Sequence, residues 1–591
     1  MPCEICSRQR MLISLILLLF FPHPTHVYSA RLEHFDTSQI SRTFPTVASM
    51  GPKPRPVHYF ELTKPHRSDH LAPSCAHSIS LLTSATARYS PPSGCSTPWS
   101  HVALQVWGTP GLSSRQFLSD PLPNLNDVTA LWLDGAELIR MSPPQSTQDG
   151  LEVFWEVRKD VTRFTSLLEK SNLSLTLTSL RTRGNESFSV SPASYQVNVS
   201  IFYYNYKYLS RSSESSMTSE TIMSCEGALK GGGGLYDPPP DLVIPLSNKK
   251  NQDEGLWFQI ESEFDVRSVG LEMPSNTMRA ILELFVSSDG DDEFWPSHRP
   301  NSIPRANHFS SKHESGAFKE VFVMIDGKIV GSEVPFPVIF PGSINPLFWE
   351  PIVAIGAFDH PTYDIDLTPF LESMIDGETH EFGIGVSRSN PFWLKSEFKG
   401  FERRLELRAR RKSRFTGWVL SSEGNFTTRV SQETELKNSI RFDLSGRYME
   451  IKHEIESERE VQVETETGQL FSLVTMKRKY PMSVTSYYTM RRPDRSTYYS
   501  GSANVTMKEK LVRGKRSRVY HNSQSTCGWV TVKDEMVVGG SARTEQNLKY
   551  RDGVSGGGCC IREAAAQNGR LLKDEASYLC GSSSSTSSSA I

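Results

Sequence analysis

Strict alternation of apolar and polar residues is the most regular pattern in this sequence. It is clearest in five segments, 172–177, 196–203, 282–286, 321–325 and 382–386. A period of two residues places every second side chain on the same face of an extended strand. Long stretches with the helical period are scarce, and clusters of Gly, Pro, Asn and Asp separate the apolar segments. The sequence therefore predicts a mainly β fold built from sandwiches or barrels.

A glycine run followed by a proline run, at 231–240, marks the clearest domain boundary. Flexible Gly-rich and stiff Pro-rich segments are typical of linkers. We therefore expect a first β-domain over 57–205, a linker over 206–240 and a second β-domain over 241–395. A further β-rich region is expected over 415–580, where the strand patterns are more polar.

Three other segments lack the pattern of a packed domain. Residues 31–56 show no periodicity and should be loose, and 581–591 form a Ser-rich tail that cannot bury a core. Residues 396–414 hold a dense group of Arg and Lys side chains, which we interpret as a solvated connector between domains. An anionic partner is the alternative, but 403–414 lack the aromatic residues that stack on bases.

The N-terminal segment, 1–30, has the layout of a secretory signal peptide. Two arginines precede the apolar run 11–21, and small residues follow Pro22. This apolar run is well short of the about 20 residues that cross a bilayer. We expect its removal, a mature chain with no stable membrane anchor, and an oxidising compartment.

Composition indicates a folded protein without a general attraction for polyanions. Of 591 residues, 37% are hydrophobic and 22% are charged, and 64 Lys and Arg balance 66 Asp and Glu. This content is sufficient for packed cores. The formal charge of -2 gives no overall field for nucleic acid, so we expect no nucleic-acid partner.

Cysteines and glycosylation sequences fit a secreted chain. Two of the nine cysteines fall in the signal segment, which leaves an odd number in the mature chain. Alternation places Asn172 and Asn198 on the solvent face of their predicted strands. The candidate N-glycosylation sites are Asn172, Asn185, Asn198, Asn425 and Asn504.

The candidate chemistry is acidic and aromatic, since the motifs of serine hydrolases, zincins and nucleotide-binding enzymes are missing from the sequence. The predicted strand 281–286 runs into an acidic segment, 289–293, and then Trp295. Crowded carboxylates raise one another's pKa, so one can donate a proton while its neighbour stays ionised. The tryptophan ring offers an apolar face to a sugar. A solvated acidic turn beside a core tryptophan is the alternative. A calcium loop is rejected because Pro300 stands where Glu is needed.

Seven blocks of the sequence follow the order found in a known family. They are 58–65, 131–140, 155–163, 255–258, 291–295, 344–349 and 357–371. Through these blocks the chain resembles the plant-type peptide N-glycanases, the peptide-N4-(N-acetyl-beta-glucosaminyl)asparagine amidase A family. The resemblance covers about residues 57–388 and weakens afterwards.

The resemblance implies a glycoamidase that hydrolyses the bond between Asn and the innermost N-acetylglucosamine of an N-glycan, giving Asp and a glycosylamine. Such an enzyme acts in mild acid on N-glycosylated peptides or unfolded glycoproteins, with no metal and no other cofactor. It is secreted, in the cell wall or in the vacuole. The implied fold has two tandem jelly-roll-like β-sandwich domains with a cleft between them. A catalytically inactive N-glycan-binding relative is the alternative function.

The resemblance also assigns roles to the acidic segment. Glu293, followed by Phe294, matches a catalytic Glu followed by an aromatic residue, and Asp292 would support it. Trp295, Phe294 and Trp132 are expected to bind substrate. Carboxylates with separated pKa values can activate water and protonate the departing nitrogen.

The catalytic carboxylate of the first domain has two candidates. The family usually reads Arg-Gln-Phe-Asp-Arg before its Trp-Leu motif, whereas here Phe117 is followed by Leu-Ser-Asp-Pro. Asp127 is nearer to Trp132 and is our first candidate. Asp120, which precedes a proline, is the alternative.

A disulfide between Cys75 and Cys95 is expected in the first domain. The two cysteines are close in a secreted chain and enclose the turn-rich stretch 89–94. They also resemble a cysteine pair of the family. Closing a loop of about 20 residues stabilises a fold by roughly 3 kcal/mol in the chain-entropy model.

Overall fold

The fold is taken from a computed structural model, which describes part of the chain. The described residues are 57–64, 72–82, 85–95, 97–110, 127–144, 153–183, 186–190, 195–205, 239–248, 256–260, 262–288, 294–298, 316–387, 392–399, 402–422, 424–443, 445–490, 496–533, 536–553 and 559–577. The predicted signal segment, the loose segment 31–56, the Ser-rich tail and most of the linker lie outside them. Within them, strands dominate and the helices are short, which confirms a mainly β protein.

The first region contains two five-stranded sheets. One has the order β1-β7-β4-β10-β2, and the other has β3-β8-β5-β6 with β9 beside β8. Its strands are β1 (Val57–Phe60), β2 (Cys75–Leu82), β3 (Thr86–Tyr89), β4 (His101–Pro110), β5 (Asp127–Leu133), β6 (Ala136–Met141), β7 (Val153–Asp160), β8 (Leu173–Arg183), β9 (Glu186–Val190) and β10 (Tyr195–Tyr204), with η3 (Thr162–Phe164) and α3 (Thr165–Leu168) after β7. Val197 and Val199 are 1% exposed on either side of Asn198, as alternation predicts. The expected disulfide joins Cys75 and Cys95.

The second region combines short strands with long irregular segments. A four-stranded sheet has the order β11-β16-β13-β14, and β12 pairs with β15. The elements are β11 (Val266–Glu272), β12 (Ile281–Phe285), η7 (Trp295–Ser297), β13 (Glu320–Ile325), β14 (Lys328–Glu333), β15 (Thr362–Asp366), η8 (Thr368–Ser373) and β16 (Thr379–Ser387). Residues 334–361 connect β14 to β15 without regular structure and are mostly buried. The jelly-roll arrangement of these two regions stays a prediction.

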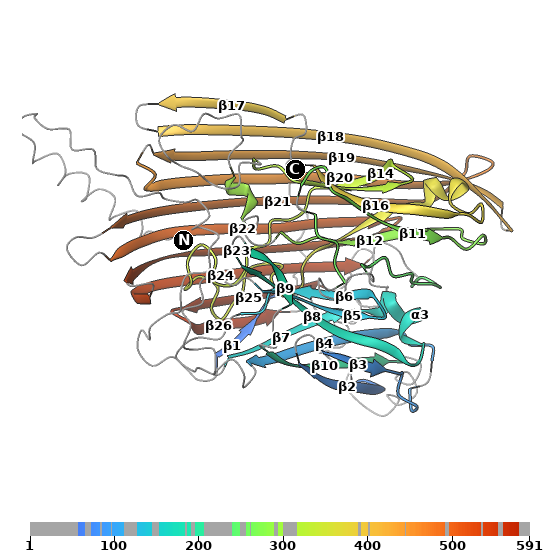
Figure 1. The fold of residues 1–591 in the computed structure, drawn as a ribbon, viewed down its shortest axis with the longest axis horizontal. Helices are drawn as coiled ribbons and strands as arrows, with labels where there is room; N and C mark the ends of the chain where they lie inside the picture. Colours follow the sequence, from blue (N-terminus) through green and yellow to red (C-terminus); the bar gives the residue numbers. More distant parts are fainter. Residues whose placement is uncertain are drawn as a thin grey trace, which may run out of the picture.

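The third region is a single antiparallel sheet of ten strands in chain order, which spans the whole length of the molecule (Figure 1). Its strands are β17 (Phe392–Lys399), β18 (Glu402–Ser421), β19 (Gly424–Asp443), β20 (Tyr448–Thr465), β21 (Leu470–Met490), β22 (Thr497–Arg513), β23 (Arg516–Lys533), β24 (Met536–Gly553), β25 (Cys559–Gln567) and β26 (Arg570–Ser577). The first region lies toward the β26 edge in Figure 1.

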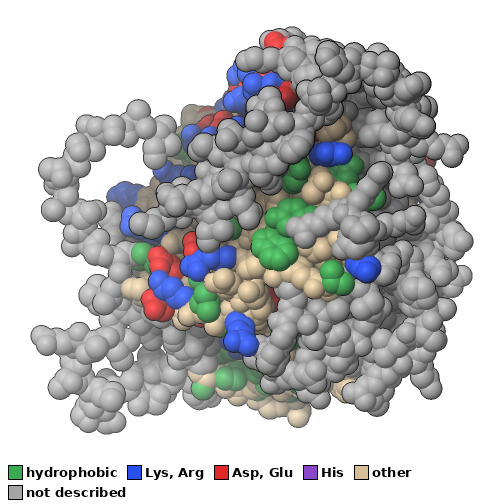
Figure 2. Space-filling model, turned by 90° about the vertical axis from the view of Figure 1, so that its left-hand side faces the viewer, with side chains coloured by type: hydrophobic (Ala, Val, Ile, Leu, Met, Phe, Trp, Pro, Cys, Tyr) green, Lys and Arg blue, Asp and Glu red, His purple; other side chains and the backbone are tan. Residues whose placement is uncertain are grey.

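The predicted basic connector 396–414 is wrong. Most of it belongs to β18, whose even-numbered residues face solvent and include Arg404, Arg408 and Arg410. The odd-numbered Leu405 and Leu407 are 2% and 3% exposed and enter the core. Most of the basic residues thus occupy the outer face of a strand, whereas Arg403 is buried and Arg411 pairs with the buried Glu320. At the end of the molecule seen in Figure 2, basic and acidic side chains lie interspersed, in line with the balanced composition.

The inner face of the ten-stranded sheet covers the other two regions, and one continuous apolar core joins all three. Many inner side chains are nevertheless polar, because they meet irregular backbone. Asn522 Nδ2 donates to Leu62 O at 2.8 Å, and Gln524 Nε2 donates to Val353 O at 2.8 Å. Buried carbonyl groups need such partners. The sheet therefore satisfies the backbone of the segments that it covers.

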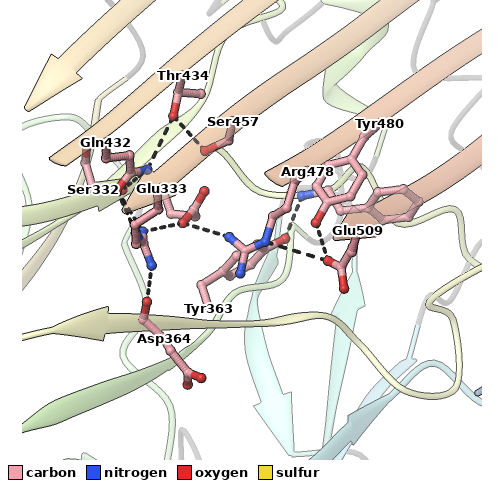
Figure 3. A network of polar contacts seen from close by, with 12 residues as sticks. Ser332, Glu333, Tyr363, Asp364, Gln432, Thr434, Ser457, Arg478, Tyr480 and Glu509 are labelled. Carbon is pink, nitrogen blue, oxygen red and sulfur yellow. Dashed lines mark hydrogen bonds and ion pairs between the residues drawn. The ribbon is translucent and has the colours of Figure 1, made fainter. Parts of the chain in front are cut away.

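A buried ionic cluster fixes the sheet to the second region (Figure 3). Arg459 Nη2 lies 2.8 Å from Glu333 Oε2, and Arg478 Nη1 lies 3.1 Å from the same oxygen. Gln432 Oε1 accepts hydrogen bonds from Arg459, whose Nη1 also donates to Asp364 O. We call these five residues the sheet cluster. Its acidic and basic groups are paired in a low-dielectric interior, which holds the layers together.

Candidate active site

The first and second regions meet where β6 runs beside the segment 354–361. His360 N donates to Arg140 O at 3.0 Å, and Ser142 N donates to Ala357 O at 2.7 Å. These backbone hydrogen bonds fix the side chains of both segments relative to one another. The polar side chains at this contact form what we call the junction.

A buried ion pair on β6 is the centre of the junction. Arg140 Nε and Nη2 donate to Glu137 Oε1 and Oε2 at 2.7 and 2.8 Å. Residues three apart in a regular strand point to opposite faces, but the register of β6 against β5 shifts here and leaves Leu138 as an extra residue. Such a bulge redirects side chains and is common beside active sites. The two charged residues are 8% and 7% exposed, so the pair is held in one geometry.

A chain of hydrogen bonds connects this pair to the end of β12. Arg140 Nη1 donates to Ser287 Oγ at 3.1 Å, and Ser287 Oγ lies 2.9 Å from His360 Nδ1. His360 Nε2 lies 2.9 Å from Ser142 Oγ. These bonds fix the end of β12 against the first region, and Ser287 there comes two residues before the predicted acidic segment in the sequence.

His360 is a neutral imidazole in this setting. Burial, followed by the nearby positive charges of Arg140 and Lys159, lowers its pKa well below the usual range. A neutral imidazole can donate at one ring nitrogen and accept at the other. That pattern suits the two serine hydroxyls and leaves His360 as a link between them.

Half-buried aromatic rings surround the ion pair. The Arg140 guanidinium lies 5.8 Å from the ring centres of both Trp257 and Phe285, which is within cation–π range. Trp257 Nε1 lies 3.5 Å from Glu137 Oε1. Lys159 Nζ lies 2.9 Å from Asp359 Oδ1 and 5.2 Å from the Phe285 ring. The junction therefore combines cations, carboxylates and an aromatic surface that solvent reaches.

Glu61 holds the segment that carries Asp359 and His360. Its carboxylate accepts hydrogen bonds from the backbone N–H groups of Gly356, Phe358 and Asp359 at 2.6, 2.8 and 3.2 Å. Burial raises its pKa from 4.5 to about 8, against the effect of these donors. The first region is thus hydrogen-bonded to this segment at a second point.

Comparison with known proteins identifies the family. Residues 69–392 match the family described as "Peptide N-acetyl-beta-D-glucosaminyl asparaginase amidase A". The chain is also 31% identical over 582 residues to the peptide-N4-(N-acetyl-beta-glucosaminyl)asparagine amidase A of Prunus dulcis, covering 90% of this chain and 95% of the relative.

The chain belongs to the peptide N-glycanase A family. No solved structure matches it. The matched segment contains β6, β12 and the segment 354–361, so the whole ion pair and its hydrogen-bond chain lie inside the family region. The ten-stranded sheet follows that segment, and the Prunus dulcis relative, matched over nearly its full length, extends across it.

The structure corrects the roles predicted for Phe294 and Trp295. Both side chains are 1% exposed. The Trp295 ring packs edge-on against the ring of His453 on β20, with 4.8 Å between the ring centres. Neither ring has a face open to a sugar. Both lie in the core beneath the ten-stranded sheet, directly after the acidic segment in the sequence. Glu293 and Asp292 themselves lie outside the described residues.

Trp132 and Asp127 occupy opposite ends of β5. Trp132 reaches the junction, where its ring contacts Trp257 at 5.8 Å, but it is 4% exposed and its N–H donates to Thr178. Five residues of strand place Asp127 roughly 17 Å from it, at about 3.4 Å per residue. The strand therefore does not bring Asp127 to the junction. Asp120 lies outside the described residues.

Sequence reasoning did not single out Glu137, Arg140, Trp257 or His360, although all four lie in blocks that resemble the peptide N-glycanase A family. One signal was present in the sequence. Glu137 and Arg140 interrupt an otherwise apolar strand, where a charged side chain has to be paired.

Two further features concern the described residues alone. No group of three or more His, Cys, Asp or Glu side chains there is placed to hold a metal ion. None of the helices in this part of the chain is long and apolar enough to cross a membrane.

Proposed function

We propose that this protein is a glycoamidase that hydrolyses the bond between Asn and the innermost N-acetylglucosamine of N-glycosylated peptides. The observation that carries the proposal is the junction. There, within the family region, a buried Glu–Arg pair of the first region is hydrogen-bonded to the strand end that leads into the acidic segment.

The reaction needs three groups around one amide. A base removes a proton from water as its oxygen attacks the Asn side-chain carbonyl, hydrogen-bond donors stabilise the oxyanion, and an acid protonates the departing nitrogen. The C–N bond then breaks, leaving Asp on the peptide and a glycosylamine on the glycan. We assign the acid–base role to Glu293, supported by Asp292.

Glu137 is our candidate for the carboxylate of the first region, in place of Asp127. Its bidentate contact with Arg140 fixes the carboxylate orientation, and it faces the half-exposed ring of Trp257. We assign the sugar-stacking role predicted for Trp295 to Trp257, since an exposed aromatic face is what a sugar ring packs against. His360 and Ser287 position these groups without exchanging protons with the substrate.

Comparison of matched variants tests the assignment. Glu137→Gln should lower kcat about 100-fold or more on an N-glycopeptide, while Asp127→Asn should retain most of the activity because of its distance along β5. Glu372→Gln, at an exposed position without a role in the junction, is the control. Products are quantified by mass spectrometry, and unfolding curves show whether each variant is folded. Full activity of Glu137→Gln, or loss with Asp127→Asn alone, overturns the assignment.

The absence of the Phe-Asp-Arg sequence after Gln116 favours a second candidate, a catalytically inactive N-glycan-binding relative. In that case the unmodified chain would bind a glycopeptide and leave it intact. Trp257→Ala would then weaken binding, whereas Glu137→Gln would change no reaction rate.

A further inference from the structure

Three tryptophans are prominently exposed among the described side chains: Trp107, Trp418 and Trp529, at 39%, 44% and 39%. Each lies on the outer face of a sheet. Covering a large exposed aromatic ring removes it from water, which is favourable. The residues that lie opposite the three tryptophans differ.

Trp107 lies directly opposite a glycosylation sequence. It pairs in register with Asn198, the acceptor residue of Asn198-Val199-Ser200. Val106 and Val199, the buried neighbours of the two residues, are 0% and 1% exposed, so Trp107 and Asn198 share the outer face. Side chains paired in this way have Cβ atoms about 4.5–5.5 Å apart.

Trp418 repeats this arrangement in the ten-stranded sheet. It pairs with Thr427, and Leu420 pairs with Asn425, so the sequence Asn425-Phe426-Thr427 lies along an apolar pair. Leu420 is 70% exposed, while Val419 between them is 4% exposed. An apolar patch on the outer face therefore lies beside the acceptor nitrogen.

Trp529 differs from both. It pairs with Ser500 on one side and Ser541 on the other, neither of which belongs to a glycosylation sequence. Its ring is stacked on Tyr498 at 5.8 Å instead. Asn504 shows the converse arrangement. It begins a glycosylation sequence in the middle of β22, on the outer face of the sheet, and the residues opposite it are Ser483 and Ser525.

We propose that Trp107 and Trp418 are platforms for the protein's own N-glycans, attached at Asn198 and Asn425. The innermost sugar presents C–H groups on one face of its ring, and this face packs on the indole in the way an aliphatic group does. Glycans are added to the unfolded chain, so the attached sugar is present when the strands pair. Asn198 and Asn425 thus carry packed glycans, whereas those at Asn504 and Asn172 extend into solvent.

Packing of these glycans also affects whether the protein can act on its own copies, an inference that rests on the proposed function. A glycoamidase that acts on the innermost sugar needs access to the bond that joins it to Asn. A sugar held on a tryptophan of a folded sheet denies this access. The two packed glycans would therefore resist removal by other copies of the same protein.

The test uses the full chain with Glu293→Gln, made in a glycosylating host, so that its own proposed activity plays no part. An added bacterial glycoamidase is applied to the folded protein, and mass spectrometry follows each site. We expect release at Asn198 and Asn425 to be about two- to tenfold slower than at Asn504, the range that aromatic packing supplies. Trp107→Ala should accelerate release at Asn198 alone, and Trp418→Ala at Asn425 alone.

A second readout does not depend on removal of the glycan. Hydroxyl-radical oxidation of Trp418 should be slower in the glycosylated chain than in Thr427→Ala, which lacks the sugar, while Trp529 should oxidise equally in both. Equal release at all sites, equal oxidation of Trp418, or absence of glycan at both Asn198 and Asn425 would overturn the proposal.

Discussion

Two clusters of buried charge join regions of this molecule, and their surroundings differ. The sheet cluster lies between the ten-stranded sheet and the second region: Glu333 accepts from two arginines, and Arg459 is also bonded to Gln432 and to a backbone carbonyl. The junction has a similar Glu–Arg pair, but the half-buried rings of Trp257 and Phe285 border it, and its Ser287 comes shortly before the acidic segment in the sequence. Its polar groups therefore lie beside aromatic rings that solvent partly reaches.

The comparison teaches that buried charge alone does not mark an active site. Structural ion-pair networks share the burial and the short distances of catalytic groups. Access and the neighbouring chemistry separate the two cases. We therefore assign attachment of the ten-stranded sheet to the sheet cluster and the reaction to the junction.

The largest effect is expected from Glu293→Gln. Glutamine keeps the size of the side chain but cannot exchange a proton in the working pH range, so activity on an N-glycopeptide should fall about 100- to 10,000-fold. The unfolding curve should be unchanged. A variant that retains full kcat would remove Glu293 from the mechanism and with it the assignment of the reaction to this side of the junction.

Arg459→Met should instead lower the stability of the fold. It leaves Glu333 buried with one arginine fewer, and breaking a buried pair destabilises a protein by about 3–5 kcal/mol. Arg410→Met, which removes an exposed arginine paired with Glu433 on the outer face, should cost about 1 kcal/mol or less. Chemical denaturation measures both. Similar losses for the two variants would contradict the distinction between the sheet cluster and the surface pairs.

The disulfide of the first region should have a moderate effect that spares the ten-stranded sheet. Replacing Cys75 and Cys95 by serine should lower the free energy of unfolding by roughly 3 kcal/mol through loss of loop closure. Limited proteolysis should then cut the first region sooner. If the whole molecule instead unfolds as one unit, the single continuous core controls its stability.

Glu61 should make the stability of the fold depend on pH. Because burial raises its pKa to about 8, the folded state binds this proton more tightly than the unfolded state. Its contribution to stability is fully present at pH values below its usual pKa of 4.5, and it is lost as the pH rises toward 8. Glu61→Gln should flatten this slope. An identical slope in the variant would assign the dependence to other groups.

Alternation of apolar and polar residues predicted the strands well where one face of the strand is buried and the other faces solvent. The segments 196–203 and 321–325 are of this kind, and both are strands with the expected buried face. The same reasoning predicted a β-rich region over 415–580 but not that its strands form one ten-stranded sheet. Its inner face carries amides such as Asn522 and Gln524, which bond irregular backbone from remote parts of the chain. No local sequence pattern predicts these long-range hydrogen bonds.

The junction could be predicted only in part for a similar reason. Strict alternation puts Glu137 and Arg140 on opposite faces of their strand, and only the bulge at Leu138 lets them pair. Trp295 illustrates the opposite error. A tryptophan after an acidic strand end has the same sequence signature whether it meets a sugar or, as here, His453 of a distant strand. Tertiary contacts decide between the two.

The most direct test of the central claim is hydrolysis of a defined N-glycopeptide by the purified, unmodified chain in water enriched in oxygen-18. The proposed attack of water on the amide carbonyl predicts a peptide in which Asn has become Asp carrying one heavy oxygen, together with a free glycan that retains its innermost sugar. Recovery of the intact glycopeptide, or of a peptide that keeps N-acetylglucosamine on an unchanged Asn, would contradict the account.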